Sequence, residues 1–114
     1  MEKLLTIDGR QVKFKSTGAF LLKYKAQFHR DALKDIYKIQ GALGEDNEIA
    51  NIEALDLEVF YDLVWTLAKT ADPSIDPPME WLDTFGEFPL MDIIPEIIDL
   101  IFSCITSTVE VKKK

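Results

Sequence analysis

The chain has 114 residues, of which 47% are hydrophobic and 29% are charged, and its formal net charge at pH 7 is −7. This length suits one domain with a hydrophobic core, and the composition excludes a wholly disordered chain. A single cysteine, Cys104, excludes an internal disulfide; it lies in an apolar stretch, where we expect a buried and unreactive thiol. Residues 1–5 lack the pattern of a signal peptide, so we expect an intracellular protein.

The charge is distributed unevenly along the chain. Residues 1–40 carry nine Lys and Arg against four Asp and Glu, a net of +5, whereas residues 41–111 carry one Lys against sixteen acids, a net of −15. Such an acidic bulk repels phosphates, so we expect no binding to nucleic acid.

The first predicted element is a β-hairpin. Two alternating runs, 3–7 and 10–15, flank Asp8-Gly9, and this dipeptide is typical of a two-residue turn in which both residues take positive φ. Two short amphipathic helices follow and meet near His29. The apolar face of the first would carry Phe20, Leu21, Tyr24 and Phe28, and that of the second Leu33, Ile36, Tyr37 and Gln40.

The acidic segment 41–54, punctuated by glycine, predicts a loop. Asp56 is the expected N-cap of the best-patterned helix, in which apolar residues recur three and four positions apart: Phe60, Leu63, Val64, Leu67, Ala68 and Ala71. The prolines that follow predict a turn. Asp76 is then expected to cap a short helix that opens at Pro77 and Pro78 and ends at Gly86.

The segment 88–105 predicts the last helix, which begins between Pro89 and Ile94 with Pro95 in its first turn. Its polar residues recur four and three positions apart: Asp92, Glu96, Asp99, Ser103, Thr106 and Glu110. Most of the remaining circumference is apolar, so we expect burial on more than one side. The carboxylates make insertion into a membrane costly, and we expect no membrane contact.

The fold class predicted from these elements is mainly α (α+β) in a single domain, 1–114. A small N-terminal β-hairpin (1–16) precedes a compact bundle of about five helices (17–108), and a flexible basic tail (109–114) closes the chain.

Motifs for catalysis, metal binding or nucleotide binding are missing from the sequence. It has one histidine, no Cys and His cluster, and no glycine-rich loop after a strand. Several carboxylates crowd one region, namely Asp72, Asp76, Glu80 and Asp83, but helix capping and solubility explain them simply. We expect a protein that is not an enzyme and that needs no cofactor and no metal.

What remains is a surplus of aromatic and aliphatic side chains, any of which has a place in the core. Two helices are apolar beyond one face, and Trp and Tyr dominate contacts between proteins, so the sequence predicts a binding module. The candidate partner-binding residues are Phe60, Tyr61, Trp65, Trp81, Phe85 and Phe88.

Five stretches occur in the order TIDGRQVKFKST, LLKYKAQFHRDALKDI, FYDLVWTLAKTADPSI, PPMEWLDTF and DIIPEIIDLI. Through them nearly the whole chain resembles the tail assembly chaperones of long-tailed phages and prophages of Gram-positive bacteria. The most specific part is Ala-Lys-x-Ala-Asp-Pro at 68–73 followed by Glu-Trp-Leu-Asp at 80–83. His29 stands where relatives often have glycine, and the family has no catalytic residues.

The resemblance implies a chaperone of the tape-measure protein, the long helical ruler around which the tail tube polymerises. Such a protein coats the apolar helical faces of the ruler, keeps the complex soluble and leaves as tube subunits add. It acts in the host bacterial cytoplasm and is not expected in the mature virion. Ribosomal frameshifting on the codons for 112–114 would add a long form that recruits the tail tube protein.

Two alternatives stay open at this point: an acidic DNA mimic that inhibits host nucleases, and a small enzyme, which the missing motifs disfavour. Self-association is a further expectation, with the basic N-terminal part of one copy against the acidic region of the next. Salt weakens such contacts between exposed charges.

Overall fold

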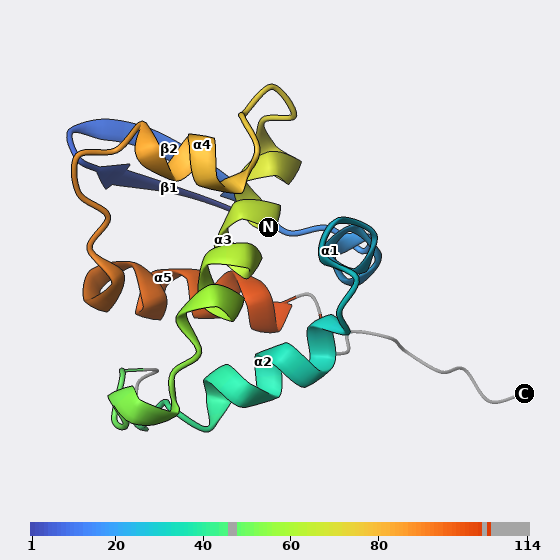
Figure 1. Ribbon diagram of the computed structural model, residues 1–114, viewed down its shortest axis with the longest axis vertical. Helices are drawn as coiled ribbons and strands as arrows, with labels where there is room; N and C mark the ends of the chain where they lie inside the picture. The colour runs from blue at the N-terminus through green and yellow to red at the C-terminus, as the bar shows by residue number, and fades with distance from the viewer. Residues whose placement is uncertain (46–47, 104, 106–114) are drawn as a thin grey trace, which may run out of the picture.

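A computed structural model describes residues 1–45, 48–103 and 105 (Figure 1). Within them an antiparallel hairpin precedes five α-helices, which confirms the predicted fold class. The elements are β1 (Glu2–Ile7), β2 (Arg10–Lys15), α1 (Phe20–Phe28), α2 (Ala32–Gln40), the 3-10 helix η2 (Ile52–Ala54), α3 (Leu57–Ala71), α4 (Pro78–Asp83) and α5 (Leu90–Ser103). The expectations for Cys104, Thr106, Glu110 and the tail 109–114 lie outside the described residues.

Helix α3 runs through the middle of the molecule (Figure 1). It contacts β2, α1, α2 and α4, with the hairpin and α4 near its C-terminal end and α2 near its N-terminal end. It is therefore buried nearly all round, which explains why its apolar surface is wider than one packing face requires. Its buried residues are Val59, Phe60, Asp62, Leu63, Val64, Trp65, Thr66, Leu67 and Ala68.

The hairpin turns as the sequence predicts, because Asp8 has φ 52° and Gly9 has φ 73°. Side chains alternate along both strands: Ile7, Val12 and Phe14 enter the core, while residues between them face outward. One face of this two-stranded sheet therefore closes the core over α3.

Helices α1 and α2 meet at His29, which takes a left-handed conformation with φ 58° and donates its backbone N–H to the Lys25 carbonyl. The predicted face of α2 is wrong at three positions, since Leu33, Tyr37 and Gln40 are exposed. Asp35 is buried instead, alongside the aliphatic residues of the inner face. A count of apolar residues alone misses this face because a paired carboxylate supplies part of it.

The N-cap of α3 is confirmed, because the Asp56 carboxylate accepts a hydrogen bond from the Val59 N–H at 3.2 Å. The predicted cap of α4 is wrong: Pro77 occupies that position and no side chain caps the helix. Asp76 instead contacts α3 through its backbone: its carbonyl accepts a hydrogen bond from Trp65 Nε1 at 2.9 Å.

Two further boundaries differ from the prediction. Helix α4 ends before Gly86, whose N–H donates to the Asp8 carboxylate at 2.7 Å and so joins the hairpin turn to the segment after α4. Pro95 lies in the second turn of α5, not the first, so the Met91 carbonyl gains no hydrogen bond from it.

The polar stripe of α5 is confirmed for Asp92, Glu96, Asp99 and Ser103, all of which are exposed. Burial on the described part of the helix is confined to one broad face, made of Ile93, Ile94, Ile97, Ile98, Leu100 and Ile101. This aliphatic face completes the core. Among the described helices, none has the length and hydropathy to cross a membrane.

Candidate functional site

Five of the six predicted partner-binding residues lie together. The ring of Phe88 is 6.0 Å from those of Tyr61 and Trp81 and 5.4 Å from that of Phe85, measured between centroids. Phe60 joins through Tyr61 at 6.4 Å. We call Phe60, Tyr61, Trp81, Phe85 and Phe88 the aromatic cluster; it fastens α4 and the following segment to α3.

Burial divides the members of the cluster into two groups. Phe60, Trp81 and Phe85 belong to the core, whereas Tyr61 and Phe88 are partly exposed. The core residues have a packing role, and the exposed pair combines a large ring with surface that another molecule can reach. Contact with a partner stays a prediction for all of them.

The sixth residue, Trp65, lies apart from the cluster. Its ring is buried and meets the ring of Phe28 edge-on, with the centroids 5.8 Å apart. Its indole N–H is bonded to the Asp76 carbonyl. Packing α1 and the 72–76 segment against α3 therefore accounts for the burial of this side chain, which also lines a pocket between α1 and α3.

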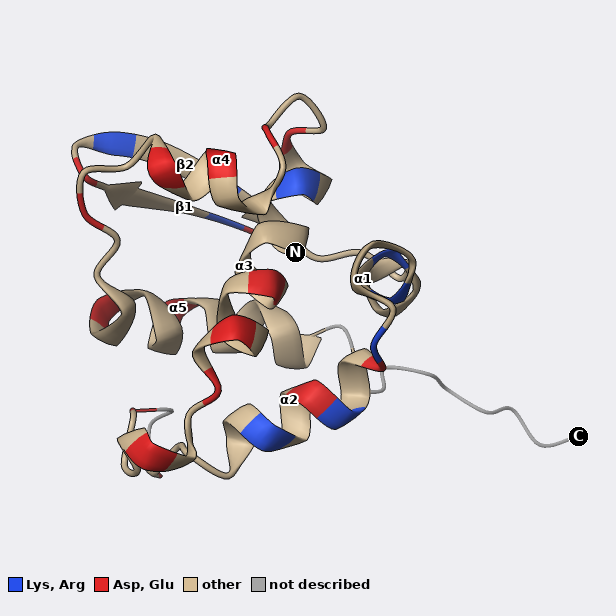
Figure 2. Cartoon of the chain, in the orientation of Figure 1, with Lys and Arg blue, Asp and Glu red and all other residues tan. Residues whose placement is uncertain are grey.

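A groove of about 590 Å³ runs between α3 and α4 beside Tyr61. Its apolar surface includes Met79, which is 71% exposed, and the half-buried Leu82. Acidic residues occur on both flanking helices (Figure 2). We call it the α3/α4 groove; it is lined by Glu58, Tyr61, Asp62, Pro78, Met79, Glu80 and Leu82.

Met79 and Leu82 were not among the predicted site residues. A signal existed, because their i, i+3 spacing puts them on one face of the short helix α4. Trp81, between them, turns to the core side. The predicted site residue of α4 was Trp81, its largest side chain, so the prediction named the buried face of the helix and not the exposed one.

On the far side of Asp62 lies a charged contact that holds α1, α2 and α3 together. Arg30 donates from Nε to Asp35 Oδ2 at 3.0 Å, from Nη2 to the Tyr24 hydroxyl at 2.9 Å, and also to Asp62. The Tyr24 hydroxyl donates to Asp35 Oδ2 at 2.7 Å. We call Tyr24, Arg30, Asp35 and Asp62 the Arg30 network.

The protonation states of this network are fixed by its contacts. The hydrogen bond to Asp62 raises the pKa of Arg30, and burial raises the pKa of Tyr24, so both keep their protons. Burial also raises the pKa of Asp62, and the bond from Arg30 opposes that shift. Arg30 occupies Asp62 and also donates from Nη1 to Glu58 at the longer distance of 3.5 Å. The freer negative charge beside the groove therefore comes from Glu80 and from Glu58, whose side chain is 78% exposed.

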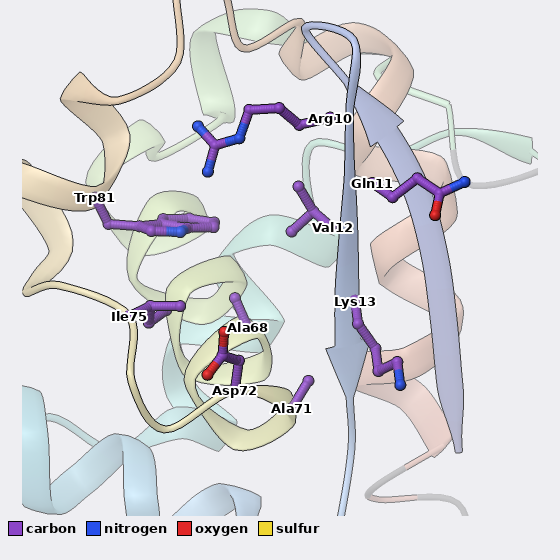
Figure 3. A pocket seen from close by; sticks show the side chains of 9 residues that line it. All are labelled: Arg10, Gln11, Val12, Lys13, Ala68, Ala71, Asp72, Ile75 and Trp81. Atoms are coloured by element: carbon purple, nitrogen blue, oxygen red, sulfur yellow. The ribbon is translucent and has the colours of Figure 1, made fainter.

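A second pocket, of about 300 Å³, lies between β2 and the C-terminal end of α3 (Figure 3). Val12 and Trp81 project into it from opposite sides, whereas the side chains of Gln11 and Lys13 are directed away from it. The guanidinium of Arg10 is 4.0 Å from the centroid of the Phe85 ring. We call it the β2 pocket; it is lined by Arg10, Gln11, Val12, Lys13, Ala68, Ala71, Asp72, Ile75 and Trp81.

Among residues 1–45, 48–103 and 105, no group of three or more His, Cys, Asp or Glu side chains is placed to hold a metal ion. The chemistry that these described sites offer is apolar contact, carboxylate charge and the backbone groups of one strand.

Comparison with known proteins found no relative of this chain. No protein-family model, no curated protein and no solved structure matches the chain. The resemblance to tail assembly chaperones therefore stays an expectation from the sequence.

Proposed function

We propose that the protein is a non-enzymatic assembly chaperone that holds apolar helical segments of the tape-measure protein in its α3/α4 groove. The observation that carries the proposal is the exposed apolar strip of Tyr61, Met79 and Leu82 with carboxylates on both sides. Phe88 extends the strip at one end, since its ring contacts that of Tyr61.

The form of the groove suits a helix. It lies between two helices, and an amphipathic helix binds such a groove through apolar side chains three and four positions apart. Burying Met79 and Leu82 under those side chains removes apolar surface from water, which favours binding. The ruler of a phage tail is a long helical protein that exposes such faces until the tube surrounds it.

Charge supports the same occupant. Glu58 and Glu80 favour a client helix whose apolar face is bordered by Lys or Arg, because opposite charges at the rim speed the encounter and fix its register. The net charge of −7 keeps the complex soluble in the host cytoplasm and is lost with the chaperone when tube subunits displace it. The protein is then left out of the finished particle.

The alternative of an acidic DNA mimic is less well supported. A mimic of DNA needs unpaired carboxylates in rows, whereas here Lys3 contacts both Glu96 and Asp99 at 3.2 Å, and Arg30 occupies Asp35 and Asp62. A nuclease pull-down at increasing salt separates the two functions. Capture of a nuclease at low salt that is lost at high salt would favour the mimic.

The test is co-expression with a phage tape-measure protein. Met79→Glu puts a charge on the apolar strip, so the amount of soluble client recovered with the chaperone should fall at least tenfold, the equivalent of about 1.4 kcal/mol. Met91→Glu is the matched control, because Met91 is 58% exposed on α5 and outside the groove.

Both substitutions fall on exposed side chains, so both variants should melt with the wild type. Client recovery that is unchanged by Met79→Glu, or that falls equally with Met91→Glu, would contradict the groove. A client that stays soluble without any chaperone would contradict the function itself.

A further inference from the structure

The outer edge of β2 is a second surface with unused binding capacity. Ser16 donates to the Met1 carbonyl and the Met1 amino group donates to the Ser16 carbonyl, so these two residues form a hydrogen-bonded pair. Hydrogen-bonded and non-hydrogen-bonded pairs alternate along an antiparallel ladder. The pairs Leu5 with Val12 and Ile7 with Arg10 are therefore bonded, and those of Gln11 and Lys13 are not.

The backbone groups of Gln11 and Lys13 consequently point away from β1. Within the described residues, no other segment forms a backbone hydrogen bond with them. Each of the two residues offers one N–H and one C=O in the geometry of an edge strand. Together they can bind a neighbouring strand through four backbone hydrogen bonds.

The β2 pocket opens along this same edge. Four consecutive residues of the strand, 10–13, line it, although side chains of a strand alternate between its faces. Figure 3 shows Gln11 and Lys13 directed away from Val12, so these two residues line the pocket with their backbone. A peptide bonded to the edge would thus direct every second side chain to the Val12 face of the sheet, where the pocket lies.

Charge selects the peptide. Lys13 is exposed and, within the described residues, forms no ion pair, while Lys15 has only a distant contact with Glu2, at 3.9 Å. A second copy of β2 would bring lysines against lysines, which repel across a sheet. Asp72 lies in the pocket wall and disfavours an acidic side chain inside it, whereas Arg10 of the same wall is bonded to Thr84 and lies over the Phe85 ring. The occupant is acidic outside the pocket and apolar inside it.

We propose that the free edge of β2 binds an extended acidic peptide segment as a third strand. Its apolar side chains, at alternate positions, enter the β2 pocket, and the Asp or Glu side chains between them face Lys13 and Lys15. This mode is strand addition, which takes its affinity from backbone hydrogen bonds and its specificity from pockets for alternate side chains. The β2 pocket shares no lining residue with the α3/α4 groove.

The probe is a capped seven-residue peptide of alternating glutamate and valine, titrated into the full chain and followed by amide NMR. Gln11→Pro removes one edge N–H but spares the ladder to β1, as proline does on the outer side of an edge strand. Thr6→Pro is the matched control, because Thr6 is the cross-strand partner of Gln11 and its N–H points to the opposite edge.

We expect Gln11→Pro to weaken peptide binding at least tenfold and Thr6→Pro to change it less than twofold. Peptide should also slow hydrogen exchange of the Gln11 and Lys13 amides. Equal affinity in the two proline variants, or exchange rates at these amides that peptide does not alter, would overturn strand addition.

A second pair of variants tests the charge without proline. Lys13→Glu should weaken binding at least fivefold, whereas Lys25→Glu, on the exposed side of α1, should not. A probe with lysine in place of glutamate should bind at least tenfold less tightly than the acidic one. Equal binding of the two probes would overturn the acidic occupant. Met79→Glu should leave all these affinities unchanged, so this test is independent of the chaperone proposal.

Discussion

Neighbouring residues of α3 belong to opposite kinds of contact. Tyr61 joins the aromatic cluster, which packs α4 through ring contacts, whereas Asp62 joins the Arg30 network, which holds α1 and α2 through charged hydrogen bonds. Successive residues of a helix point about 100° apart, so one helix serves both sides. No buried polar side-chain atom of the described residues lacks a hydrogen-bond partner, so burial leaves no polar group of the charged side unpaired.

The difference lies in how each side contributes to stability. Rings buried in the cluster remove a large apolar area from water, and their edge-to-face contacts add about 0.5–1.5 kcal/mol per pair. The Arg30 network gains little net free energy over an apolar contact, because its charges lose hydration. It instead fixes the positions of three helices, since each bond requires its partner in one place.

The largest expected effect comes from the apolar side. Trp81→Ala should lower the free energy of unfolding by about 3–5 kcal/mol, because Trp81 is 4% exposed and its removal leaves a cavity beside Phe85 and Phe88. Urea denaturation measures the change. Met79→Ala, on the exposed face of the same helix, should change it by less than about 0.5 kcal/mol. Equal losses would show that α4 does not divide into a core face and a groove face.

The next effect tests the charged side. Arg30→Met should lower the free energy of unfolding by about 2–3 kcal/mol, because it leaves the buried Asp35 and Asp62 without their cation. The loss is not larger because the arginine side chain is 33% exposed, so water already screens part of the interaction. The stability of Arg30→Lys should lie between those of wild type and Arg30→Met, since lysine keeps the charge but lacks the planar guanidinium group.

A triple variant sharpens that comparison. Adding Asp35→Asn and Asp62→Asn to Arg30→Met removes the orphaned charges, so much of the lost stability should return. A triple variant no more stable than Arg30→Met would show that the network contributes attraction and not only position.

The smallest effect concerns a charged contact that is more open to solvent. Lys3→Met should cost about 0.2–1 kcal/mol at pH 7, because Lys3 links β1 to Glu96 and Asp99 on α5 at an exposed site. Although burial disfavours the ammonium, the hydrogen bonds to Asp99 and Glu96 raise the pKa of Lys3 above 10.5. The contribution is therefore full below pH 10.5 and is lost as pH rises through the folded-state value.

Chemical denaturation of wild type and Lys3→Met across pH 9 to 12 measures this loss, and the two curves should converge at the alkaline end. Lys15→Met is the control, since Lys15 lies 3.9 Å from Glu2 and both are well exposed. A stability difference for Lys3→Met that grows with pH would contradict the assignment.

Local chemistry decided the elements that the sequence predicted correctly. Asp8-Gly9 turned the hairpin, Asp56 capped α3, and the carboxylates of α5 marked its outer face, because each of these features depends on residues within a turn or two of itself. The aromatic residues of the predicted site did gather, with the exception of Trp65, because large rings near one another in a small domain share one core.

Contacts between distant segments decided the rest. Gly86 donates to Asp8 across 78 positions, the Asp76 carbonyl accepts from Trp65, and the buried Asp35 accepts from both Arg30 and Tyr24. Periodicity records how often an apolar residue recurs, and it carries no information about which distant side chain satisfies a polar one. The sequence by itself therefore determined the order and type of the elements. Which face of α4 is open, and which edge of β2 is free, depended on packing that only the tertiary structure contains.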